Sequence, residues 1–102
     1  MGIISALFGN NKTDFKGLTD KGALIVDVRS PQEFASGHID GSVNMPLPTI
    51  GTKTAFLRTG GKPVITCCRS GARSGVAAEV LKAAGIEVYN GGAWDNLRKK
   101  IQ

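Results

Sequence analysis

The chain has 102 residues, of which 41% are hydrophobic and 21% charged, and its formal net charge is +5. This length suits one domain, in which folding removes roughly two-thirds of the chain's surface from water. The composition excludes a disordered chain, and no apolar run approaches the ~18 residues that a membrane span requires. The two cysteines are neighbours, which excludes a secreted disulfide scaffold and favours a reducing compartment.

The basic residues are scattered, apart from Arg98, Lys99 and Lys100 near the end of the chain. There is one Trp and one Tyr, and basic and aromatic residues do not alternate, so nucleic-acid binding has little support. Residues 1–13 are expected to form an N-terminal arm or short helix, because the apolar stretch 3–8 is too short for a secretory signal. We therefore expect a cytoplasmic protein with one domain over residues 14–102 that binds neither nucleic acid nor membrane.

Along that domain, short apolar runs rich in β-branched residues alternate with helical patterns. In chain order they predict a strand over 23–28, a helix over 31–36, a short strand over 42–44, a helix over 50–57, a strand over 63–67, a helix over 73–84, a strand over 86–89 and a closing helix over 93–101. Strands and helices that alternate over short connections predict an α/β fold with a mostly parallel sheet covered on both faces.

The most informative segment is Cys68-Arg69-Ser70-Gly71-Ala72-Arg73-Ser74, which joins the strand over 63–67 to the next helix. Ligands of parallel α/β sheets bind beyond the carboxyl ends of the strands. The backbone N–H groups of such a loop can form an anion-binding concavity, to which the helix N-terminus, Arg69 and Arg73 add positive charge. We expect these groups to make Cys68 a thiolate, whereas Cys67 continues the apolar strand and packs in the core.

This segment resembles the active-site loop of the rhodanese-like sulfurtransferases, which run strand, Cys, Arg-Ser-Gly-x-Arg-Ser, helix. Three further segments resemble the family in the right order: Asp27-Val28-Arg29 with Glu33-Phe34, Gly37-His38-Ile39 through Pro46, and Gly91-Gly92-Ala93-Trp94. The similarity covers about residues 14–101, and the combination is highly specific. It implies a rhodanese-like three-layer α/β domain, with a mostly parallel sheet of about five strands and helices on both faces.

The resemblance also implies a sulfurtransferase in which Cys68 takes the outer sulfur of a small anionic donor, such as thiosulfate, as a persulfide. The acceptor would be cyanide in the assay, and a small thiol or a protein cysteine in the cell. Backbone amides of residues 69–73 would stabilise the charge, Arg69 and Arg73 would attract the anion, and Ser70 and Ser74 would add hydroxyl donors. No cofactor besides the covalent persulfide is expected.

Two other functions stay open. The family most often has Tyr or another apolar residue where this chain has Cys67, and the spacing from Cys67 to Arg73 is Cys-x5-Arg, that of cysteine phosphatases. A non-enzymatic alternative is a persulfide carrier that hands its sulfur from Cys68 to a partner protein.

Three residues outside the loop are expected to support the site. Asp27 and Arg29 end the first buried strand, where a carboxylate and a guanidinium would pair and orient neighbouring loops. His38, the only histidine, is expected to be hydrogen-bonded and to hold the turn that leads to Ser42. A metal site is not expected, because adjacent cysteines and one histidine do not make a tetrahedral ligand set.

Overall fold

The computed structural model describes residues 12–102, so most of the expected N-terminal arm over 1–13 lies outside the described residues. The elements in chain order are α2 (Phe15–Asp20), β1 (Leu24–Asp27), α3 (Pro31–Ala35), β2 (Val43–Asn44), the 3-10 helix η1 (Leu47–Lys53), α4 (Thr54–Gly60), β3 (Val64–Cys68), α5 (Ala72–Ala83), β4 (Val88–Ala93) and α6 (Trp94–Ile101). None of the helices within 12–102 is long and apolar enough to cross a membrane.

The sheet has the strand order β2-β1-β3-β4, and every neighbouring pair is parallel. The expected α/β fold with a parallel sheet is confirmed, but the expected number of about five strands is wrong for residues 12–102, which contain four. The physical reason is that only four runs in this part of the chain have strand character. Because all four strands are parallel, their carboxyl ends meet at one edge of the sheet.

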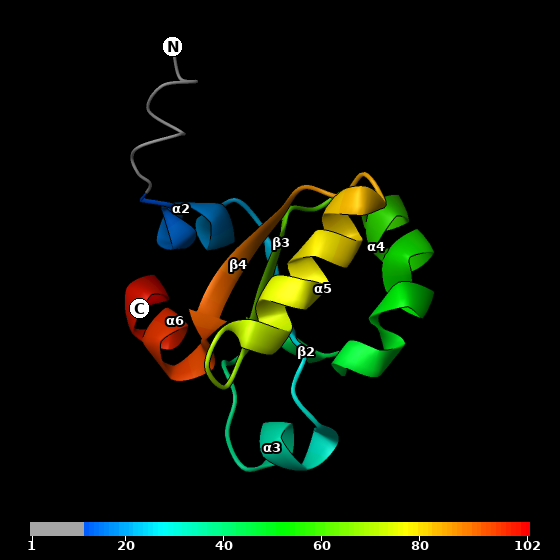
Figure 1. Ribbon diagram of the computed structural model, residues 1–102. Coiled ribbons are helices and arrows are strands. Elements are labelled where there is room, and N and C mark those ends of the chain that lie inside the picture. Colours follow the sequence, from blue (N-terminus) through cyan, green and yellow to red (C-terminus); the bar gives the residue numbers. More distant parts are fainter. Residues whose placement is uncertain (1–11) are drawn as a thin grey trace.

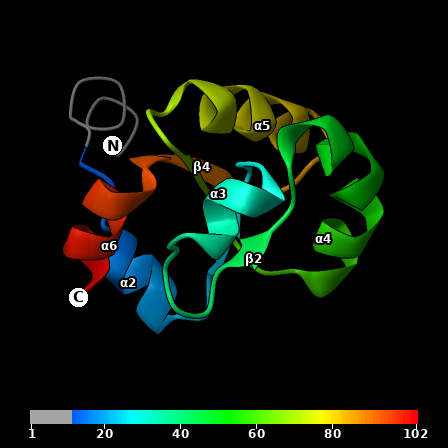
Figure 2. The same cartoon turned by 90° about the horizontal axis from the view of Figure 1, so that it is seen from below.

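Helices cover both faces of the sheet (Figure 1), with α2 and α6 on one face and η1, α4 and α5 on the other. Each face has its own hydrophobic core. The larger core, beneath η1, α4 and α5, contains Val26, Val28, Met45, Ile50, Leu57, Val64, Cys68, Ala77, Leu81 and Ile86. The smaller, beneath α2 and α6, contains Ile25, Ile39, Ile65, Cys67 and Leu97. Figure 2 looks onto the carboxyl ends of the strands, where α3 lies between the two helical layers.

Several element boundaries differ from the sequence prediction. Helix α2 was not predicted; the Asp14 carboxylate caps it by accepting a hydrogen bond from the Gly17 amide at 2.9 Å. The helix expected over 50–57 is two consecutive helices, η1 and α4. By contrast, α3 begins as predicted, since Ser30 and Glu33 form a complete capping box in front of it.

Strand β4 begins two residues later than predicted and continues to Ala93. A register irregularity between Thr66 and Cys68 of β3 accompanies this extension. Position 91 requires glycine, because a Cβ there would lie 2.8 Å from the carbonyl oxygen of Thr66 and 2.8 Å from the side chain of Leu97. The bulged strand therefore brings residues 90–92 against the loop that follows Cys68.

Candidate active site

Cys68 is the last residue of β3. The sequence predicts a strand that ends at residue 67 and therefore places Cys68 in the loop. Its side chain is 0% exposed and belongs to the core on the α5 side of the sheet. The loop that follows is short, because α5 already begins at Ala72. Gly71 precedes the helix with a left-handed φ of 104°, a conformation that favours glycine. This turn folds the chain back over the sulfur.

Three hydrogen-bonding groups surround the sulfur of Cys68. The Gly71 amide donates to it at 3.0 Å and the Ser74 amide at 3.3 Å, while the Ser74 hydroxyl lies 3.4 Å away. Burial by itself raises the pKa of the thiol, but hydrogen bonds from Ser74 and from the Gly71 and Ser70 amides outweigh burial and hold it below its ordinary value. Cys68 therefore has the environment of a nucleophilic cysteine.

Cys67 has the opposite environment, because successive residues of a strand face opposite sides of the sheet. Its side chain is fully buried and packs with Ile25, Ile65 and Leu97 beneath α6. Burial raises the pKa of the Cys67 thiol to about 12. The expected packing role of Cys67 is confirmed.

The two arginines of the loop differ in their partners. Arg73 donates two parallel hydrogen bonds to the Glu33 carboxylate, at 2.8 and 3.0 Å. The Arg73 hydrogen bonds, together with those from Ser30, lower the pKa of Glu33 to about 2. Arg69 and Ser70 are exposed, and within residues 12–102 neither side chain makes a hydrogen bond or ion pair. No carboxylate of residues 12–102 therefore balances the charge of Arg69.

The expected pair of Asp27 and Arg29 is present and buried. The guanidinium of Arg29 donates to the Asp27 carboxylate at 2.6, 2.9 and 3.0 Å. It also donates to the carbonyl of Gly37 at 2.7 Å and lies 4.6 Å from the ring centre of Trp94. The pair therefore joins β1 to the segment after α3 and to the start of α6, as a support for the loops around the site.

His38 lies in the turn after α3. Its Nδ1 is 2.8 Å from the carbonyl oxygen of Phe34, and its ring stacks on the ring of Phe34 at 3.7 Å. This is the hydrogen-bonded histidine that the sequence predicts. Ser42, where the turn ends, donates to the carbonyl of Ile39 at 2.6 Å.

Comparison with known proteins identifies the family. The family described as Rhodanese-like domain matches residues 11–96, which is most of the chain. The chain belongs to this family. Its four-stranded parallel sheet with helices on both faces is the fold of rhodanese-like structures, as the resemblance of the sequence implied.

Three relatives illustrate the similarity. The uncharacterized protein YqhL of Bacillus subtilis is 44% identical over 69 residues, 67% of this chain and 54% of that protein, so this chain spans about half of its length. Thiosulfate sulfurtransferase GlpE of Pseudomonas syringae is 37% identical over 78 residues, 74% of this chain and 71% of that protein. A solved structure of "rhodanese with anions from E. coli" is 27% identical with a TM-score of 0.67, covering 74% of this chain and 91% of that one.

Two partners of the rhodanese-like loop were not predicted as site residues. The sequence singles out Glu33 only within the Glu33-Phe34 segment that resembles the family; in the structure its pairing with Arg73 joins α3 to α5. Asn90 of β4 hydrogen-bonds to the Ser74 hydroxyl at 2.6 Å and to the Gly71 carbonyl at 3.3 Å. The available signal for Asn90 was its place directly before the Gly91-Gly92 segment.

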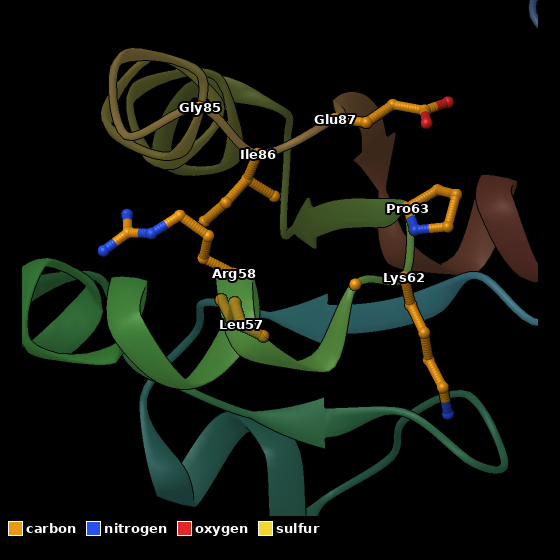
Figure 3. Close-up of a pocket in the computed structure, with 8 residues that line it drawn as sticks. Leu57, Arg58, Lys62, Pro63, Gly85, Ile86 and Glu87 are labelled. Atoms are coloured by element: carbon orange, nitrogen blue, oxygen red, sulfur yellow. The ribbon is translucent and has the colours of Figure 1, made fainter.

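A pocket lies at the end of the sheet opposite Cys68. A cavity of about 210 Å³ lies at the amino end of β3, between the ends of α4 and α5 (Figure 3). Arg58 and Glu87 at its rim point away from each other, and no cysteine or histidine lines it. Over the described part of the chain, no cluster of three or more His, Cys, Asp or Glu could hold a metal ion. This pocket lies at the opposite end of β3 from Cys68, the candidate nucleophile.

Proposed function

We propose that this rhodanese-like protein is a sulfurtransferase that moves the outer sulfur of thiosulfate, or of another sulfane sulfur donor, through a persulfide on Cys68. One observation carries the proposal: the Gly71 amide, the Ser74 amide and the Ser74 hydroxyl converge on the sulfur of Cys68. The relative named thiosulfate sulfurtransferase supports the choice of donor, and the rhodanese with anions supports an anionic one.

The first half-reaction is a displacement at sulfur. The Cys68 thiolate attacks the outer sulfur of thiosulfate, a new S–S bond forms, and the bond to the sulfonate sulfur breaks. Sulfite leaves with the electron pair of that bond, and the outer sulfur remains on Cys68 as an anionic persulfide. In the second half-reaction, cyanide or a thiolate attacks the outer sulfur of the persulfide. Thiocyanate or a new persulfide then leaves, and the Cys68 thiolate is regenerated.

The amides of Gly71 and Ser74 serve both states of the cysteine, because the thiolate and the persulfide are both anions. The amides that close over Cys68 would stabilise the charge in each state without reorganising. Arg69, exposed on the loop, would attract the donor anion, and Ser70 beside it would add a hydroxyl donor. Arg73 would act by holding the loop to α3 through Glu33 rather than as an unbalanced charge.

The alternative of a cysteine phosphatase that uses Cys67 has no support from the geometry. The Cys67 side chain packs on the opposite face of the sheet from the loop, and its pKa of about 12 keeps it a thiol at neutral pH. A cytoplasmic location belongs to the same proposal, because two free cysteines favour a reducing compartment.

The test is mass spectrometry of the protein after treatment with thiosulfate. We expect an adduct of about 32 Da, the mass of one sulfur atom, on a peptide containing Cys68. Cys68→Ser should form no adduct and should not transfer sulfur to cyanide, whereas the matched variant Cys67→Ser should keep both. An adduct that persists in Cys68→Ser but disappears in Cys67→Ser would refute the assignment. Slow transfer to cyanide together with rapid transfer to a protein thiol would indicate a persulfide carrier.

A further inference from the structure

Asn90 makes a set of hydrogen bonds to the loop around Cys68. Its Oδ1 accepts from the Gly92 amide at 3.0 Å and from the Ser74 hydroxyl at 2.6 Å. Its Nδ2 donates to the carbonyl of Gly71 at 3.3 Å. Thr66 adds a second anchor by donating to the carbonyl of Ser74 at 2.9 Å. Ser74 is thus held between the sheet and the sulfur.

The orientation of the Asn90 amide follows from its neighbours. A flipped amide would place its NH₂ against the Gly92 N–H and its oxygen against the Gly71 carbonyl, and both contacts would be repulsive. The oxygen of Asn90 therefore faces Ser74. The serine hydroxyl has only one hydrogen and two acceptors in reach, Asn90 Oδ1 at 2.6 Å and the Gly71 carbonyl at 3.2 Å. The nearer acceptor, Asn90, takes that hydrogen, and the hydroxyl offers a lone pair to Cys68, 3.4 Å away.

This arrangement suits the protonated form of Cys68, whose S–H can donate to the Ser74 oxygen. When Cys68 loses its proton to solvent, the sulfur becomes a charged acceptor, and the Ser74 hydroxyl stabilises it only by rotating its hydrogen away from Asn90. Asn90, the Gly71 carbonyl and the sulfur thus compete for one hydrogen, and Asn90 is the nearest of the three. Asn90 also holds the loop in place.

We propose that Asn90 is a positioning residue that acts through the Ser74 hydroxyl to set how readily Cys68 loses its proton. The proposal rests on the proposed function only in taking Cys68 as the nucleophile. The side chain of Asn90 is exposed and reaches over Ser74 from β4, so it can be replaced without altering either core.

The other charged or titratable groups around Cys68 lie on different elements. Arg73 of α5 is paired with Glu33 of α3, and Asp27 of β1 is paired with Arg29. Cys67 of β3 faces the other side of the sheet, and Arg69 is exposed on the loop. On β4, Tyr89 donates to the carboxylate of Glu87, which precedes the strand, and Asn90 itself is uncharged. A change at Asn90 therefore leaves each of these pairs intact.

The experiment measures the rate of alkylation of Cys68 by iodoacetamide as a function of pH, with the modified cysteine located by peptide mass mapping. Asn90→Asp should raise the midpoint of this profile by about half a pH unit, because a carboxylate keeps the Ser74 hydrogen and repels the thiolate. Asn90→Ala should lower the midpoint, because the nearest acceptor of that hydrogen is gone and only the Gly71 carbonyl, 3.2 Å away, still competes with the sulfur. Asn96→Asp makes the same chemical change at an exposed position of α6 and should leave the midpoint unchanged.

The route through Ser74 is tested by repeating Asn90→Asp in a Ser74→Ala background, where its effect should be clearly smaller. An equal shift in both backgrounds would show that the carboxylate acts through space, and would overturn the proposal. So would a shift of the same sign in Asn90→Asp and Asn90→Ala, which is the signature of loop damage alone. Failure of the wild type to form a persulfide would refute the proposed function, yet the alkylation profiles would still decide the role of Asn90.

Discussion

Replacing Arg29 by methionine tests whether the buried pair with Asp27 supports the site or takes part in its chemistry. The guanidinium is 4% exposed and Asp27 is 0% exposed. Arg29→Met keeps a long apolar side chain but removes every guanidinium hydrogen bond to Asp27 and the one to Gly37. It leaves a buried carboxylate that keeps the backbone amide of residue 29 as a donor at 3.0 Å.

The expected loss of stability is large. Removing one partner of a buried ion pair typically costs about 3–5 kcal/mol, because the remaining charge stays buried without its counter-ion. The total stability of such a domain is about 5–15 kcal/mol. At about 4–8 °C per kcal/mol for a domain of this size, the Tm should fall by at least about 12 °C.

The assay is thermal and denaturant-induced unfolding, with Arg98→Met as the matched control. Arg98 stacks on the same Trp94 ring at 4.8 Å but is exposed, so its replacement should change stability by less than about 0.5 kcal/mol. At a temperature where Arg29→Met is folded, its rate of alkylation at Cys68 should stay within about twofold of the wild type, because Arg29 makes no hydrogen bond to that sulfur.

Equal stability of Arg29→Met and Arg98→Met would refute this reasoning. A normal Tm with a collapsed rate at Cys68 would instead assign Arg29 to the chemistry.

Three further expectations concern the loop and the cysteines. The pKa of Glu33 is lowered from 4.5 to about 2, so its pair with Arg73 stabilises the fold above pH 4.5 and is lost as pH falls through 2. Glu33→Gln should therefore show a shallower fall in Tm across that window than the wild type. Cys67 should resist iodoacetamide at pH 8 in the folded protein, since its pKa of about 12 keeps it a thiol and it packs beneath α6, away from the loop; rapid labelling would contradict this packing. Hydrolysis of p-nitrophenyl phosphate should be undetectable, and any hydrolysis that Cys67→Ala abolishes would restore the phosphatase interpretation.

The sequence by itself determined the features that depend on neighbouring residues. Apolar runs of strand length located the strands, and the Ser30 and Glu33 capping box located the start of α3. The alternation of a strand, with period two, explains why adjacent cysteines differ, so that Cys67 packs in one core while Cys68 meets the loop. The loop after Cys68 was also readable, because a thiol, a glycine and two arginines are contiguous in the chain.

Only the tertiary structure decided which distant side chains complete the site. Glu33 and Arg73 are 40 residues apart and Ser74 and Asn90 are 16 apart, and no local spacing relates either pair. They meet because parallel strands bring the carboxyl ends of β1, β3 and β4 to one edge of the sheet, together with α3 and the start of α5. The length of β4 was decided in the same way, since it depends on the close approach of Gly91 to the backbone of Thr66. Pairing between elements depends on how they pack, and packing is a property of the whole chain rather than of any one segment.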